Sequence, residues 1–254
     1  MSRVVFAFAL HLFATPLFAA AVAEMPQLQI FVLLGQSNMA GRGALVADSA
    51  VAVHPRVFKF TRDQMWVPAT EPLHFDSSRA GAGLAASFAA TLADADPHIA
   101  IGLVPCAVGN TPLSRWEPGG DLLASAIART KAALRAGKLR GFLWHQGESD
   151  AKELALAATY ACRLAATIRH LRVELNAAET PFLVGRLGEW LRVTTHPHAH
   201  VLNEQLTALP LLVPWVTIVD STGLMHRGDF AHFDTPSLRG FGVRFAESLI
   251  STRQ

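Results

Sequence analysis

A serine sits where a nucleophile could act, directly after the first apolar run of the chain. The stretch 28–34 is almost continuously apolar, and Gly35 then permits a sharp turn before Gln36 and Ser37. A serine at such a turn can present its hydroxyl to a bound ligand, while N–H groups at the start of a following helix can hold an oxyanion. The same position also suits a helix cap, and Ser37 taken alone favours that simpler role.

A second cluster of reactive types is "WHQGESD", residues 144–150. The Gln146 amide can donate to a developing oxyanion. His145 is either a base or a hydrogen-bonded core histidine, because it lies right at the end of an apolar run. Glu148 could position neighbouring loops. Asp150, with Glu153 three residues later, predicts the cap of the next helix.

The C-terminal stretch "HRGDFAHFDTPSLRGFG" holds a carboxylate and an imidazole three residues apart, Asp229 and His232. Side chains at this spacing are neighbours on a helical turn, and a carboxylate can then orient an imidazole for use as a base. A D-x-x-H pair is a weak signal alone, and His226 and Asp234 compete for the same roles. Asp220 is a further carboxylate, which we expect to close the turn of "DSTG".

These stretches need a scaffold that brings them together, and the apolar pattern predicts one. Short apolar runs recur at 28–34, 99–104, 141–144, 182–184 and 216–219, as expected for strands buried on both faces of a parallel sheet. The segment 56–60 could add a short strand. Helical periodicity lies between the runs, in the stretches around 84–92, 123–134, 156–175 and 238–249. Strands alternating with helices predict one doubly wound α/β domain over about 27–252.

In such a sheet, ligands bind beyond the carboxyl ends of the strands. Ser37, Gly109 and Gln146 each follow a predicted strand and are therefore expected at one edge. Gly109 lets backbone approach a ligand closely, although an ordinary turn explains it equally well when it is considered alone.

Composition excludes some classes of protein. The chain has 254 residues, 51% of them hydrophobic, with a formal net charge of +2 and no basic run, so nucleic-acid binding is not expected. The two cysteines, Cys106 and Cys162, lack the spacing of a zinc site. An exported protein could pair them, but two buried small hydrophobic residues are the expectation here.

The first 23 residues have the pattern of a secretory signal peptide. Arg3 supplies a positive start, an apolar stretch follows to Phe18, and Ala21-Val22-Ala23 gives a cleavage site before Glu24. A membrane anchor is the alternative, but the apolar stretch is short for a span. We therefore expect a signal peptide over 1–23, a single domain over 24–254, no stable membrane span after cleavage, and export to the periplasm or the extracellular space.

Four motifs in order resemble the SGNH hydrolases: "GQSNMAGRG", "AVGNTPLSRW", "WHQGESD" and "DFAHFD". They are most similar to the sialate O-acetylesterase-like branch, which includes carbohydrate esterases of family six, the acetyl xylan esterases. "EPLHFDSSRAGAGLAASFA" at 71–89 is similar to the segment that follows the first motif there. The resemblance spans about Ile30 to Leu249.

This resemblance implies a three-layer α/β/α fold with a mainly parallel, five-stranded, flavodoxin-like sheet and ester hydrolysis without a metal or other cofactor. Ser37 matches the nucleophile, His232 the base and Asp229 its orienting carboxylate. The N–H groups of Ser37 and Gly109 and the Gln146 side chain match the oxyanion hole. The branch often has a second glycine where this chain has Asn110.

The function expected from the sequence is removal of acetyl groups from an acetylated carbohydrate through an acyl-enzyme. A sialate O-acetylesterase, another short-acyl esterase or a catalytically silent carbohydrate-binding protein are the alternatives. Specificity is expected in loops such as 62–78 and 186–200. The latter carries His196, His198 and His200, which could bind a metal but are better explained by an exposed loop or edge strand. The sequence assigns no role to Gln36, Asn38, Arg115 or Glu148, and specifies no oligomeric state.

Overall fold

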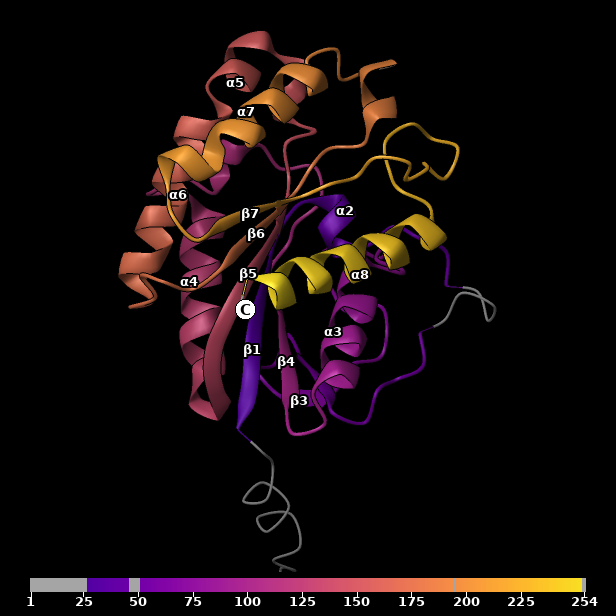
Figure 1. Cartoon of the computed structure of the whole chain (residues 1–254), viewed down its shortest axis with the longest axis vertical. Helices are drawn as coiled ribbons and strands as arrows, with labels where there is room; N and C mark the ends of the chain where they lie inside the picture. Colours follow the sequence, from indigo (N-terminus) through magenta and orange to yellow (C-terminus); the bar gives the residue numbers. More distant parts are fainter. Residues whose placement is uncertain (1–26, 46–50, 194, 253–254) are drawn as a thin grey trace, which may run out of the picture.

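A computed structural model describes residues 27–45, 51–193 and 195–252. The expected signal peptide at 1–23 lies outside these residues. Within them the chain forms one central sheet with helices on both faces (Figure 1). The three-layer α/β/α architecture expected from the sequence is therefore confirmed.

The sheet has seven strands in the order β3-β2-β4-β1-β5-β6-β7. All neighbouring strands are parallel except β2 and β3, which pair antiparallel. The strands are β1 (Leu28–Gly35), β2 (Val57–Phe60), β3 (Trp66–Pro68), β4 (Ala100–Pro105), β5 (Gly137–His145), β6 (Phe182–Gly185) and β7 (Val216–Val219).

The five apolar runs form the strands expected of them, but the expected count of five strands is wrong. The segment 56–60 does supply β2, and β3 pairs with it at the edge of the sheet. Because β3 is only three residues long and ends in Pro68, it has too little apolar alternation to be recognised. Proline, which cannot donate to a strand ladder, is tolerated at such an edge.

The central strand β1 contributes to both hydrophobic cores. Ile30, Val32 and Leu34 pack in one core, whereas Phe31 and Leu33 pack in the other, because successive side chains point to opposite faces of the sheet. This double burial explains why β1 has an unbroken apolar run instead of an alternating one.

Each core lies beneath its own helical layer. One layer is α3 (Leu84–Ala95) and α8 (Thr235–Ser251), which pack against each other (Figure 1). The other is formed by α4 (Asp121–Ala133), α5 (Leu154–Ala158), α6 (Tyr160–Glu174) and α7 (Ala199–Leu212). No helix in the described part of the chain is long and apolar enough to cross a membrane.

Two helical expectations need correction. The helix expected from Asp150 onward is divided into a 3₁₀ turn (Asp150–Lys152), α5 and α6, and neither the turn nor α5 has a side-chain cap. Asp150 does not cap because its carboxylate is buried and bonded elsewhere. Helix α7 was not expected, although Leu202, Leu206 and Leu209 line its buried face; Pro210 near its end obscures the pattern.

The cysteines also differ from expectation. Both are free, and Cys162 is exposed on the outer face of α6, so it is not the buried small residue expected from an apolar helix pattern. Cys106, just after β4, is half-buried.

Gly35 fixes how β1 and β5 end beside each other. It pairs with His145 in the ladder and has a φ of +129°, and an added Cβ would lie 2.0 Å from the His145 carbonyl oxygen. The next N–H, that of Gln36, donates to the same oxygen at 2.9 Å. Only glycine permits this approach, which places the residues after β1 against those after β5.

We expect Gly35→Ala to lower the free energy of unfolding by at least about 3 kcal/mol, because it combines a strained φ with a backbone overlap. Urea unfolding measures this loss. Gly119→Ala is the matched control: Gly119 also has a positive φ, +91°, but nothing lies within 4 Å of its added Cβ. Its loss should be about 1 kcal/mol. Equal losses in the two variants would contradict this account of Gly35.

Candidate active site

A cleft of about 1610 Å³ opens where β1, β4 and β5 end. Five segments supply most of its wall: 36–45, 76–81, 108–110, 148–152 and 226–236. The predicted strand exits and the C-terminal stretch therefore meet at one place, as the rule for ligand sites in open α/β sheets requires.

Ser37 is the first residue of α2 (Ser37–Ala40), which begins directly after the turn that follows β1. Gln36 occupies the cap position and no side chain caps this helix, so Ser37 does not have the capping role that it would favour if taken alone. The hydroxyl instead lies 3.1 Å from Nε2 of His232. Ser37 also lines the cleft, with 7% of its surface exposed.

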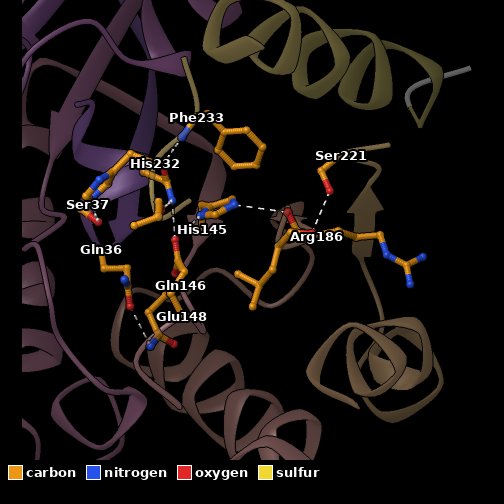
Figure 2. Close-up of polar contacts among 12 residues, drawn as sticks. Gln36, Ser37, His145, Gln146, Glu148, Arg186, Ser221, His232 and Phe233 are labelled. Carbon is orange, nitrogen blue, oxygen red and sulfur yellow. Dashed lines mark hydrogen bonds and ion pairs between the residues drawn. The ribbon is translucent and has the colours of Figure 1, made fainter. Parts of the chain in front are cut away.

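Asp229 bonds to the other nitrogen of the same ring, with 2.8 Å between its Oδ2 and His232 Nδ1. Because an ionised carboxylate only accepts, Nδ1 carries the proton, and Nε2 of a neutral ring then accepts the Ser37 hydroxyl proton. Ser37, His232 and Asp229 thus form the continuous chain that nucleophilic catalysis uses (Figure 2 shows the Ser37 and His232 side chains).

The Asp229–His232 pair lies in a loop, not on the helical turn that its spacing suggested. Asp229 Oδ1 accepts the backbone N–H groups of Ala231 at 3.0 Å and His232 at 2.8 Å, which folds the loop back on itself. Partial burial raises the pKa of the Asp229 carboxyl, but the hydrogen bonds from the His232 ring and the two N–H groups outweigh it and hold that pKa at about 2. The carboxylate is therefore ionised at neutral pH.

The competing residues of this stretch have other partners. Asp234 caps α8 by accepting the Ser237 N–H at 2.8 Å. His226 lines the cleft, but its Nδ1 accepts the N–H of Gly228 at 3.0 Å. Asp220 accepts the Thr222 hydroxyl at 2.9 Å, as expected for a residue that closes its own turn.

His145 is a core histidine. It is fully buried, its Nε2–H donates to the Arg186 carbonyl across 3.2 Å (Figure 2), and the rings of Phe233 and Phe241 pack edge-on against it. Burial lowers the pKa of its imidazole, and nearby Glu148 only partly opposes this effect. Of the two roles open from the sequence, the structure supports the core role.

Gly109 lies beside Ser37, and its added Cβ would be 3.6 Å from Ser37 Cβ and 2.6 Å from Arg42 Nη2. Its N–H donates to Asp76 Oδ2 at 2.9 Å. The next residue, Asn110, stands where the family often has glycine and adopts a φ of +58°. Asparagine tolerates this left-handed conformation, so the loop keeps a glycine-like path.

Gln146 lies behind the cleft wall instead of on it. The side chain is fully buried, and its Nε2 lies 2.7 Å from Asp150 Oδ2 and 3.0 Å from the Thr111 carbonyl. Its Oε1 accepts the Tyr160 hydroxyl at 2.6 Å. In this structure both amide N–H groups are used, and neither is presented to Ser37.

Sequence reasoning did not find the buried ion pair of Arg42 and Asp76, 2.6 Å long, which lines the cleft next to Gly109. Both residues lie inside motifs that carry the family resemblance. Nothing in either motif predicts that these two side chains, 34 positions apart in the sequence, form a pair. Arg115, which had no assigned role, pairs with Asp121 and does not line the cleft.

The three alternating histidines separate in the structure. His196 is buried in the cleft wall, His198 precedes α7, and His200 is exposed within α7, so the loop is not an edge strand. Among the described residues, no group of three or more His, Cys, Asp or Glu side chains is placed to hold a metal ion.

The three-layer α/β/α fold, with Ser37, His232 and Asp229 in contact at the carboxyl edge of its sheet, fits the class of hydrolases that the four sequence motifs resemble. Residues 27–251 match the family described as carbohydrate esterase, sialic acid-specific acetylesterase. The chain belongs to this family.

Similar proteins agree with this assignment. A probable carbohydrate esterase of Arabidopsis thaliana is 29% identical over 248 residues, covering 90% of this chain and 93% of the relative. The solved structure of this same Arabidopsis thaliana protein has a TM-score of 0.81 at 29% identity, covering 89% of this chain and 99% of the other. The structure of NanS has the same fold, with a TM-score of 0.76 at 19% identity and coverage of 89% and 98%.

Proposed function

We propose that this protein is a carbohydrate O-acetylesterase that uses Ser37 as its nucleophile. The observation that carries the proposal is the chain Ser37–His232–Asp229, with contacts of 3.1 Å and 2.8 Å, on a cleft of a carbohydrate esterase family member. Acetylated sugars, including O-acetyl sialic acids, are the proposed substrates because the family is described by that specificity.

The proposed reaction has two halves. Ser37 Oγ attacks the acetyl carbonyl carbon while His232 Nε2 takes the hydroxyl proton, and the carbonyl electron pair moves onto the oxygen. Collapse of this intermediate breaks the bond to the sugar oxygen, which receives the proton from His232. Water then repeats the attack on the acyl-serine and releases acetate.

Asp229 supports both halves as a fixed negative charge. With a pKa of about 2 it stays ionised at any pH where the imidazole works, so it stabilises the imidazolium that forms in each half. Protonation of Asp229 therefore contributes nothing to the pH dependence of kcat near neutrality.

A carbohydrate-binding protein without catalysis is the alternative from another class. An ionised Asp229 and a Ser37 hydroxyl bonded to the histidine support the enzyme, because a binding site needs neither.

We expect the intact protein to release acetate from at least one member of a panel of acetylated xylan, acetylated glucan and O-acetyl sialic acid. Ser37→Ala should lower kcat by at least about 10³-fold, because no other group supplies the attacking oxygen. A fluorophosphonate probe followed by peptide mapping should label Ser37 in the parent. Folded protein that binds a sugar of the panel without labelling or turnover would instead be the carbohydrate-binding protein.

For the oxyanion, we propose the N–H groups of Ser37 and Gly109 and the side-chain amide of Gln146 as donors. The Ser37 N–H has no acceptor within the described ranges. To bind the oxyanion, the Gly109 N–H would have to give up its hydrogen bond to Asp76. The Gln146 amide would likewise have to give up its hydrogen bond to the Thr111 carbonyl.

Gln146→Met tests the third donor, since it keeps the length of the side chain and removes the amide. Loss of one such donor should lower kcat by about 10²–10³-fold. Tyr160→Phe is the matched control, because it removes the hydroxyl bonded to Gln146 Oε1 and keeps the amide. It should lower kcat by less than about 10-fold. If Gln146→Met and Tyr160→Phe have equal stability in urea and lower kcat equally, Gln146 is not an oxyanion donor and only supports the structure of the cleft wall.

We also propose that the protein is exported, on the basis of the signal-peptide pattern of residues 1–23. The full-length chain expressed in a bacterial host with a periplasm should then be recovered outside the cytoplasm with Glu24 as its first residue. N-terminal sequencing measures this, and recovery of an uncleaved chain from the cytoplasm would contradict export.

A further inference from the structure

Asn38, the residue after the nucleophile, connects the serine turn to the loop that carries the base. Its Oδ1 accepts the backbone N–H of Phe233 at 3.0 Å, and its Nδ2 donates to the backbone carbonyl of Ala231 at 3.1 Å. These two residues flank His232 on either side. One side chain therefore holds both peptide neighbours of the base.

The third contact of Asn38 is with Glu148, which follows β5. Asn38 Nδ2 donates to Glu148 Oε1 at 2.6 Å, and both side chains are almost fully buried. A carboxylamide offers two N–H donors and one carbonyl acceptor, and these contacts use all three groups. The partners also fix the orientation of the amide, because a reversed amide would set an N–H against the Phe233 N–H.

Arg227 also holds the loop, because its N–H donates to the His232 carbonyl at 2.9 Å and its guanidinium contacts Asp229 Oδ2 at 2.9 Å and the Arg42 carbonyl. A quarter of the His232 side chain and a third of the Asp229 side chain are exposed, and their loop has no regular secondary structure. Phe233 anchors one end by packing against Trp190 and Phe241. Asn38 is on α2 with Ser37, so its bonds set the position of the loop relative to the nucleophile itself.

We propose that Asn38 is a positioning residue that sets the contact between Ser37 and His232, and that the Glu148 carboxylate holds Asn38 in the required orientation. This proposal rests on the proposed function, since positioning the base matters only if Ser37 reacts. It assigns roles to two residues whose roles the sequence left open.

Asn38→Ala should lower kcat for an aryl acetate by about 10–100-fold while KM changes less than about 3-fold, because a misplaced base harms reaction more than binding. Asn203→Ala is the matched control. Asn203 also bonds both backbone groups of one residue, Leu187, at 2.9 Å and 3.0 Å, but it does not line the cleft. We expect it to lose stability and to keep the parent kcat.

Asn38→Asp gives a readout that a purely structural role would not produce. The new carboxylate would face Glu148 at hydrogen-bond distance, and two carboxylates so close retain one proton between them. The shared proton would restore a bond to Glu148, so the kcat of the variant should come closest to that of the parent at low pH and fall further below it as pH rises. The other ionisable groups facing Glu148 are His145 at 3.6 Å, His196 and Tyr160, and all three are kept in this variant.

The double variant Asn38→Asp with Glu148→Gln exchanges donor and acceptor, because the glutamine amide can donate to the new carboxylate. It should recover kcat at high pH relative to Asn38→Asp alone. A uniform fall in kcat for Asn38→Asp at every pH, without recovery in the double variant, would overturn the proposal, as would a parent-like kcat in Asn38→Ala.

Failure of the proposed function can be distinguished from failure of this inference. If the parent hydrolyses no acetyl ester, the proposed function fails, and crystal structures then test the positioning. The Ser37 Oγ to His232 Nε2 distance should exceed hydrogen-bond length in Asn38→Ala and stay near 3.1 Å in Asn203→Ala. An unchanged distance in Asn38→Ala would overturn the inference.

Discussion

One hydrogen bond, between residues 195 positions apart, governs the arrangement of the site: the bond from Ser37 to His232. The bond forms only because separate parts of the fold position the two residues. Ser37 is placed by the end of β1, where Gly35 lets the chain turn against the last residue of β5. His232 is placed by a loop that begins after β7 and ends at the cap of α8. The sheet is the frame that brings both ends to one cleft.

Beneath the cleft, a buried polar network replaces the apolar packing found elsewhere in the sheet. Asp150 accepts from the Leu113 N–H, the Gln146 amide and Arg163, and the Tyr160 hydroxyl contacts Gln146 and the indole N–H of Trp144. Such a network is stable only when its members are satisfied, and it then specifies one arrangement. It fixes the segment 144–150 from behind.

Much of the fold followed from the sequence because parallel strands buried on both faces leave unbroken apolar runs, as β1 does. Two elements, β3 and α7, were not predicted because their sequence patterns are weak. Strand β3 has only three residues, and α7 has a proline near its end. The roles expected of Ser37, Asp229 and His232 rested on the family resemblance, since the spacing of Asp229 and His232 suggested a helical turn that the structure does not form. The partners of Gln146, Asp150 and Arg42 could not be predicted, because each bonds to a residue from another segment.

The serine turn and the Asp229–His232 loop differ in how deeply they are buried in the fold. The serine turn is buried between the strands and the helices, whereas the Asp229–His232 loop is partly exposed and is attached through Phe233, Asn38 and Arg227. Segments with few buried contacts open locally at a lower free energy than the core does. Heat should therefore separate His232 from an intact Ser37 turn first, so that loss of the proposed activity would precede global melting and reverse on cooling.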